Sequence, residues 1–219
     1  MSVVLLVRHG QASWASPDYD RLSPLGQEQS RLLGAALSRR GVRPDLMVRG
    51  SMRRHRETAT AAVAGAGWAG EVVEDAGWDE FDHLRTLTGR IDFPEVPDEP
   101  YDERVRRVEA IIERWASGRH DEEYHEGFPA FRLRVEQAFG RTAERLEPRQ
   151  TAVVFTSGGP VSWVTAGLLD GGVPTWSRLS KVVVNSSVTK VVLGRRGRSL
   201  VSFNDHGHLE GRDGLLSYR

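Results

Sequence analysis

The sequence Val3-Val4-Leu5-Leu6-Val7 is followed directly by Arg8-His9-Gly10. A short, continuous apolar run rich in β-branched residues is typical of a strand that is buried on both faces of a parallel sheet. Ligands of open α/β sheets bind at the carboxyl ends of the strands. These eight residues therefore predict a central strand that delivers a basic residue and a titratable residue to a ligand site.

Strand and helix patterns alternate along the rest of the chain. Ser23 and Pro24 provide an N-cap and a first-turn proline for a helix that ends before Gly41. The other expected strands are residues 45–48, 72–73, 151–155, 181–184, 188–193 and 199–203, and the other expected helices are 52–66, 102–116, 128–146 and 160–169. We predict an α/β fold, a three-layer α/β/α sandwich around a mainly parallel sheet with an antiparallel edge strand.

The length of 219 residues suits one domain, and only one region departs from the strand-helix alternation. Residues 92–102 are acidic and rich in proline, and two helices are expected after them. We therefore predict a single domain over residues 1–219 with a helical insertion at about residues 79–148.

The composition excludes several classes of protein. The chain has 30 Lys and Arg against 30 Asp and Glu, which argues against binding to nucleic acid or to an anionic membrane by overall charge. It has no cysteine, which excludes a disulfide scaffold, a thiolate metal site and a cysteine nucleophile. The apolar run at residues 3–7 is too short for a signal peptide or a membrane span, so we expect a cytoplasmic protein.

Arginine dominates the basic residues, since only Lys181 and Lys190 are lysines and the other 28 are arginines. Codon drift would produce this bias, and so would a need for planar groups that bind phosphate or carboxylate. Composition leaves both explanations open.

Polar residues follow the expected strands. These residues are Arg8, His9 and Gly10, then Arg54, Glu80, Ser157, Gly158 and Gly159, and finally Asn204-Asp205-His206-Gly207-His208. Arginine binds phosphate through two parallel hydrogen bonds, and the free N–H groups at a helix start add partial positive charge. The set predicts an anion site with an acid or base beside it.

His9 is the candidate nucleophile: its neutral imidazole would attack phosphorus, and Glu80 would protonate the leaving oxygen and later take a proton from water. The alternative for His9 is a structural histidine at a strand end, and the alternative for Glu80 is an ordinary exposed carboxylate. The flanking Arg8 and Gly10 favour the catalytic interpretation of His9. Arg54 lies in a segment with four other basic residues, for which a solvated helix face is the alternative: Arg49, Arg53, His55 and Arg56.

Three segments carry a family resemblance: Arg8-His9-Gly10, Leu22-Ser23-Pro24-Leu25-Gly26-Gln27-Glu28-Gln29, and Arg54-His55-Arg56-Glu57-Thr58-Ala59. They resemble the first branch of the histidine phosphatase superfamily, the phosphoglycerate mutase-like proteins, and the similarity spans nearly the whole chain. The resemblance implies a phosphohistidine on His9, phosphate clamps at Arg8 and Arg54, a proton donor at Glu80, and no metal or other cofactor. The expected phosphate-binding set is Arg8, Gly10, Gln11, Arg54, Ser157, Gly158, Gly159 and His208.

The chain departs from the family pattern after the expected strand 151–155. The family usually has a second histidine there, in a His-Gly-Gly context, where this chain has Ser157. Removing one preorganised donor typically costs about 10²–10³ in rate, so we expect a slowed enzyme. The candidate replacement cations are His83, His206 and His208, and the resemblance of residues 204–209 to the family's closing segment favours His208. A second departure, Ala15 in place of a frequent asparagine, leaves the substrate open.

We predict a phosphoric monoester hydrolase that acts on a small or medium-sized phosphate ester, with no nucleic acid or membrane partner. Two alternatives remain for the function: a weakly active or non-catalytic phosphate-binding member of the same fold, and a phosphomutase. A homodimer is the alternative to a monomer. A serine hydrolase at Ser157 is disfavoured, because a nucleophile elbow needs glycine where Phe155 stands. A metal site at His120 and His125 is disfavoured too, because a spacing of five does not put both on one helix face.

Overall fold

The computed structural model describes residues 1–13, 20–81 and 100–218. They form two compact units, one made of Met1–Asp79 with Val135–Arg219 and the other of Glu80–Arg134. A single domain over the whole chain remains a prediction.

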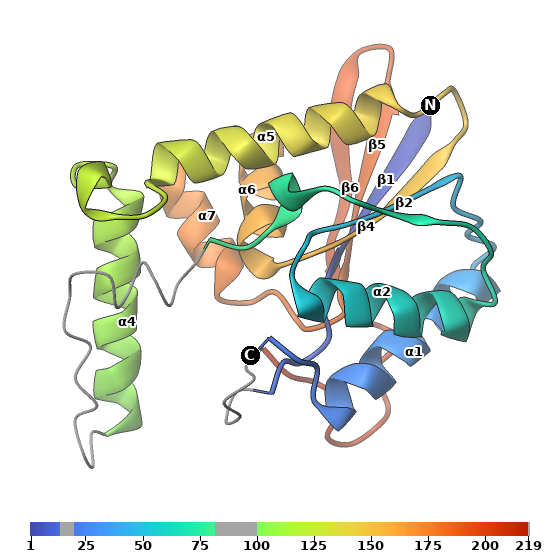
Figure 1. Cartoon of the computed structure of the whole chain (residues 1–219), viewed down its shortest axis with the longest axis horizontal. Helices are drawn as coiled ribbons and strands as arrows, with labels where there is room; N and C mark the ends of the chain where they lie inside the picture. Colours follow the sequence, from blue (N-terminus) through green and yellow to red (C-terminus); the bar gives the residue numbers. More distant parts are fainter. Residues whose placement is uncertain (14–19, 82–99, 219) are drawn as a thin grey trace. The chain divides into compact units, whose positions relative to one another are not determined.

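A six-stranded sheet forms the centre of the first unit (Figure 1). Its strands are β1 (Ser2–Arg8), β2 (Leu46–Arg49), β3 (Val72–Glu74), β4 (Thr151–Thr156), β5 (Val188–Gly194) and β6 (Gly197–Asp205), in the order β3-β2-β4-β1-β5-β6. Strands β3, β2, β4 and β1 run parallel to one another, whereas β5 is antiparallel to β1 and β6 is antiparallel to β5. The predicted α/β fold, with a mainly parallel sheet and an antiparallel edge, is confirmed.

Helices α1 (Pro24–Arg39) and α2 (Arg53–Ala66) cover one face of this sheet and lie side by side (Figure 1). Their buried residues pack against one face of β1 and β4 in a single cluster that includes Leu5, Val7, Leu33, Leu37, Ala59, Ala62, Val153 and Phe155. Side chains alternate between the faces of a strand, so Val4 and Leu6, which are also fully buried, face the opposite side. Helix α6 (Gly158–Leu168) contacts β1 and β6, which gives the layers of the predicted sandwich.

The start of α1 confirms its predicted cap. The Ser23 hydroxyl accepts a hydrogen bond from the Gly26 N–H at 3.0 Å, and Pro24 is the first helical residue. This cap fixes where the chain turns from the loop after β1 into the helix.

The strand predicted at residues 181–184 is wrong, because these residues form a turn after α7 (Val173–Ser180), a helix that the sequence patterns did not predict. Their backbone groups bond within local turns and to side chains instead of to a neighbouring strand: the Val182 N–H donates to the Leu179 carbonyl at 3.1 Å, for example. The Val183 carbonyl accepts from Arg8 Nη1, and the Val184 N–H donates to Asn204 Oδ1 at 2.8 Å. The two valines are nevertheless buried, which explains why the segment has the apolar pattern of a strand.

The second unit contains α4 (Tyr101–Ala116) and the beginning of α5 (Phe128–Glu144), so both helices predicted in this region are present. Four aromatic rings form its buried centre: Phe81, Trp115, Phe128 and Phe131. Among the described residues, no group of three or more His, Cys, Asp or Glu side chains could hold a metal ion. None of the helices in the described ranges is long and apolar enough to cross a membrane.

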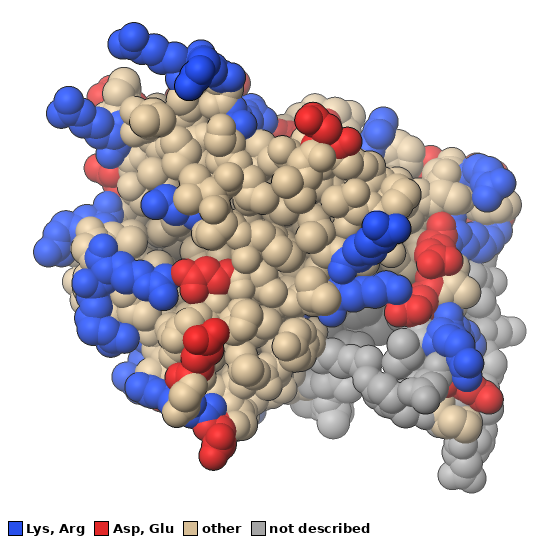
Figure 2. Space-filling model, turned by 180° about the vertical axis from the view of Figure 1, so that it is seen from behind, with Lys and Arg blue, Asp and Glu red and all other residues tan. Residues whose placement is uncertain are grey.

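Many arginines are paired with acids on the surface. Examples are Arg31 with Glu28 at 2.7 Å and Arg40 with Asp205 at 2.6 Å. On the face shown in Figure 2, basic and acidic side chains lie interspersed around a largely uncharged centre. Such exposed pairs contribute little to stability, because water and salt screen their attraction. These arginines serve the solvated surface and not the site after β1.

Candidate active site

The backbone of His9 is held on two sides at the carboxyl end of β1. Its N–H donates to the Thr156 carbonyl at 2.8 Å, at the end of the neighbouring β4. Its carbonyl accepts from the Ser186 N–H at 3.1 Å and from Asn185 Nδ2 at 3.2 Å. The side chain is only 5% exposed. The strand register and the turn at residues 185–187 therefore determine where the imidazole lies.

The His9 ring is oriented by its own loop. Nδ1 lies 2.7 Å from the Gly10 carbonyl oxygen, which only accepts hydrogen bonds, so Nδ1 carries the proton and Nε2 keeps its lone pair. Burial lowers the pKa of His9 well below its ordinary value, and the positive charges of Arg54 and Arg8 lower it further. His9 is therefore neutral at pH 7, which is the form a nucleophile needs.

Gly10 lies where a side chain would not fit. A Cβ at this position would lie 2.7 Å from Ser30 Oγ and 2.9 Å from the Gly26 carbonyl carbon, and closer still to that carbonyl oxygen. The Gly10 N–H donates to Thr58 Oγ1 of α2 at 3.0 Å. The loop after β1 is thus held between α1 and α2.

Gln11 is held by the start of α1. Its N–H donates to Gln29 Oε1 at 2.9 Å, and its own Oε1 accepts from the Ser23 hydroxyl at 2.8 Å. The segment that carries the family resemblance at residues 22–29 therefore positions the loop that bears His9.

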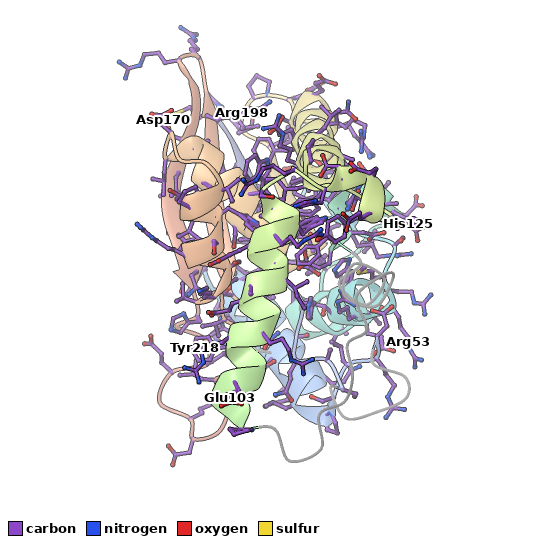
Figure 3. All side chains as sticks on the ribbon, turned by 90° about the vertical axis from the view of Figure 1, so that its left-hand side faces the viewer. Arg53, Glu103, His125, Asp170, Arg198 and Tyr218 are labelled. Carbon is purple, nitrogen blue, oxygen red and sulfur yellow. The ribbon has the colours of Figure 1, made fainter. Side chains whose placement is uncertain are left out.

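Arg54 and Arg8 place positive charge beside His9. Arg54, at the start of α2, is 4% exposed and pairs through Nη1 with Asp20 Oδ1 at 2.7 Å. Arg8 donates through Nη1 to the carbonyls of Val183 and Tyr218, the latter at 3.0 Å, and Tyr218 is labelled near the end of the chain in Figure 3. Both arginines contribute to the low pKa of His9, as expected for charges close to its ring.

The start of α6 lies beside Arg8. A Cβ at Gly158 would lie 3.6 Å from Arg8 Nε, so the first turn of this helix approaches the guanidinium closely. Gly158 and Gly159 are the first two residues of the helix, the end at which its partial positive charge lies. Ser157 precedes them as the N-cap, yet its side chain makes no capping hydrogen bond.

Ser157 instead contacts a histidine that the sequence patterns did not single out as a site residue. Its hydroxyl lies 2.7 Å from His55 Nε2, and both side chains are fully buried. The His55 ring centroid is 5.9 Å from that of His9. The basic character of the segment suggested a solvated face, but Ala59 and Ala62, four and seven residues further along α2, are buried with His55. This helical spacing was the signal that could have identified it.

The other histidines have different surroundings. His208 Nε2 lies 2.9 Å from the Ser186 hydroxyl, and burial lowers the pKa of His208 to about 4, so it is neutral near pH 7. His206 contacts the Asn204 carbonyl through Nδ1 at 2.6 Å. His83 and Ala15 lie outside the described residues.

Glu80 belongs to the second unit, where its carboxylate accepts a hydrogen bond from the Phe81 N–H at 3.2 Å. Its role as proton donor stays a prediction.

An α/β fold whose parallel strands end at a buried, neutral histidine with two buried or half-buried arginines is suited to chemistry on an anionic group. The family follows from the sequence as a whole. Residues 4–206 match the histidine phosphatase superfamily (branch 1), and the chain belongs to this superfamily.

Known proteins resemble the chain in part or over most of its length. A 2,3-bisphosphoglycerate-dependent phosphoglycerate mutase of Thermobifida fusca (strain YX) is 36% identical over 74 residues, which cover 31% of this chain and 30% of that protein. A phosphoserine phosphatase mutant from Entamoeba histolytica, solved with phosphoserine, superposes with a TM-score of 0.68 at 19% identity over 95% of this chain and 100% of that one. A putative alpha-ribazole-5'-P phosphatase from Escherichia coli has a TM-score of 0.68 at 20% identity, covering 94% and 98% of the two chains. At these identities the two structures establish a shared fold.

Proposed function

We propose that this protein is a phosphatase that hydrolyses a small or medium-sized phosphate monoester through a phosphohistidine on His9. The observation that carries the proposal is the state of the His9 ring: Nδ1 is tied to the Gly10 carbonyl, Nε2 retains its lone pair, and burial keeps the ring neutral. Membership of the superfamily and the phosphatases among the similar structures support it.

The proposed reaction has two steps. Nε2 of His9 attacks phosphorus, an N–P bond forms, and the P–O bond to the alcohol breaks as the leaving oxygen takes a proton from Glu80. Water then attacks the phosphohistidine, the N–P bond breaks, inorganic phosphate leaves, and Glu80 takes a proton from the water. The atoms balance without a metal or another cofactor.

The binding of the phosphoryl group would rest on Arg8, Arg54 and the start of α6. A phosphate monoester carries about −1.5 to −2 charges near pH 7. Each guanidinium carries five N–H donors in a planar fork, the geometry that suits two parallel hydrogen bonds to a phosphate. The N–H groups of Gly158 and Gly159 would complete the anion site.

Ser157 in place of the family's usual second histidine leaves this site one imidazole short at that position. We therefore expect turnover below that of a member with both histidines, by about 10²–10³ if nothing compensates. A phosphomutase must also retain a bisphosphate intermediate, which needs a strongly cationic site, so the serine favours hydrolysis.

The proposal is tested with p-nitrophenyl phosphate and the variants His9→Ala and His125→Ala. His125 is exposed and is labelled in Figure 3, so its variant is a matched histidine control. We expect turnover and an acid-labile phosphoenzyme in the wild type and in His125→Ala, and neither in His9→Ala. Turnover that survives in His9→Ala would refute the nucleophile, and an acid-stable phosphoenzyme would point to Ser157 instead.

The mutase alternative is supported by the partial match to a phosphoglycerate mutase. Incubation with 3-phosphoglycerate and a trace of 2,3-bisphosphoglycerate distinguishes the two reactions. A phosphatase releases inorganic phosphate, whereas a mutase forms 2-phosphoglycerate without net release.

A further inference from the structure

The Ser157–His55 contact continues to a third residue, the half-buried Asp79, whose side chain is 18% exposed. His55 Nδ1 lies 3.6 Å from Asp79 Oδ1, on the opposite side of the ring from Ser157. Asp79 is held in place by the Ser51 N–H at 2.6 Å and by the Ser51 hydroxyl at 2.5 Å. Among the described residues Nδ1 has no hydrogen-bond partner, and the carboxylate faces it across a gap longer than a hydrogen bond. On its other side the imidazole lies within hydrogen-bond distance of the Ser157 hydroxyl, at the N-cap of α6.

Gly50 leaves the space in which the imidazole and the carboxylate meet. A Cβ at Gly50 would lie 2.5 Å from Asp79 Oδ1 and 2.9 Å from His55 Cε1, and closer still to His55 Nδ1. Gly50 directly follows β2, and its N–H donates to the Phe155 carbonyl of β4 at 3.0 Å. The strand end itself is thus shaped to accommodate this pair.

We propose that Asp79, His55 and Ser157 form a relay that brings a positive charge to the bound phosphoryl group. Protonated His55 donates through Nε2 to the Ser157 oxygen, and the Ser157 hydroxyl donates to a phosphoryl oxygen. His55 acts through Ser157 and is a positioning residue, whereas Ser157 binds the phosphate. The inference rests on the proposed function, since it assigns to a second histidine the charge that residue 157 lacks.

The chemistry of the three groups decides the direction of these hydrogen bonds. If His55 is neutral, with its proton on Nδ1 facing Asp79, Nε2 accepts a hydrogen bond from the Ser157 hydroxyl. Only the lone pairs of the Ser157 oxygen then face the phosphate. If His55 carries both protons, Nε2 donates a hydrogen bond to the Ser157 oxygen, and Nδ1 faces the Asp79 carboxylate as an ion pair at 3.6 Å. The Ser157 hydroxyl hydrogen then turns toward the phosphate. A bound phosphate dianion therefore favours the protonated form.

The charges around His55 make this protonation depend on the ligand. Burial lowers the pKa of His55, and the positive charge of Arg54 lowers it further. The carboxylates of Asp79 and Asp20 act in the opposite direction and raise it. His9, 5.9 Å away between ring centroids, is neutral. In the free protein His55 is accordingly neutral near pH 7, and we expect it to take up a proton when phosphate binds.

Calorimetric titration with inorganic phosphate at pH 7, in two buffers of different ionisation enthalpy, measures both affinity and proton uptake. The variants are His55→Gln, which keeps a donor but cannot become charged, Ser157→Ala, the double variant, and the exposed control His125→Gln. Phosphate can itself gain or lose protons on binding, and this contribution is shared by the wild type and all variants. The difference in proton uptake between the variants therefore reports on the relay.

We expect His55→Gln and Ser157→Ala each to weaken phosphate binding by about tenfold to a hundredfold, the range of a hydrogen bond to a charged group. The phosphate affinity of the double variant should equal that of the single variant with the lower affinity, because the two residues act as one unit. Proton uptake should fall by the same amount in all three and stay unchanged in His125→Gln.

The outcomes separate the relay from the proposed function, since phosphate binding requires no turnover. Wild-type uptake in a folded His55→Gln variant, or additive losses in the double variant, would overturn the relay alone. A wild type that binds phosphate but forms no phosphohistidine would overturn the proposed reaction alone, and a wild type that does not bind phosphate would overturn both. If His55→Gln does not fold, Ser157→Ala decides by the same measurement, because without the hydroxyl the extra uptake should disappear.

Discussion

Gly10→Ala tests whether the loop after β1 determines the reactivity of His9. The added Cβ would lie 2.9 Å from the Gly26 carbonyl carbon, whereas an ordinary contact begins at 3.4 Å, so the loop or α1 must move by about 0.5 Å or more. The obstacle is backbone, which cannot move aside as the end of a flexible side chain can. The Gly10 carbonyl accepts the hydrogen bond from His9 Nδ1, and it moves with the loop.

The expected cost has a structural part and a functional part. Overpacking of this kind costs about 1–3 kcal/mol, which for a chain of this size lowers Tm by about 3–10 °C. Misplacement of a reacting group by about 1 Å costs on the order of a hundredfold in rate, so we expect kcat/KM for p-nitrophenyl phosphate to fall by about tenfold to a hundredfold.

The matched control is Gly140→Ala on α5, where an added Cβ meets nothing within 4 Å. It should leave kcat/KM unchanged and raise stability by about 0.5–1 kcal/mol, because alanine is the better helix former. Thermal denaturation and steady-state kinetics on both variants provide the comparison. A Gly10→Ala protein with wild-type Tm, or one that loses stability but keeps its kcat/KM, would refute the link between this loop and His9.

Three further predictions concern the charges of the site. Ser157→His alone should lower turnover because its ring would meet His55, which now lies 2.7 Å from the hydroxyl, whereas adding His55→Ala should restore turnover in the same kinetic assay. Arg54→Lys should lower kcat/KM by about tenfold to a hundredfold, because an ammonium cannot make two parallel hydrogen bonds to phosphate; wild-type kinetics would contradict the assigned clamp. Burial lowers the pKa of His9, His55 and His208, so each binds a proton more readily in the unfolded chain. The free energy of unfolding from urea titrations should therefore be fully retained above about pH 6.5 and fall as the pH is lowered toward 4, and a flat profile would contradict these shifts.

The local patterns of the chain were enough for the sheet and for the loop that bears His9. The apolar run at residues 3–7 became β1, which finds backbone partners in β4 and β5. The Ser23 cap became the start of α1 because a cap depends on neighbouring residues only. The strand predicted at residues 181–184 failed because periodicity reports burial, while strand formation also needs a backbone partner. There the partners are the side chains of Arg8 and Asn204, which are distant in sequence.

The amino-acid sequence was sufficient for the class of fold and for the family, since strand and helix patterns alternate along the whole chain and the family match covers residues 4–206. The basic, glycine-bounded setting of His9 lies in one contiguous motif. Which histidine lies beside Ser157 depends on how distant parts of the chain pack together. His208 was favoured by its motif, yet burial holds its pKa near 4, and it lies against Ser186. His55 is 102 positions from Ser157, and the two meet because α2 and the end of β4 converge at one edge of the sheet. No local pattern encodes that distance.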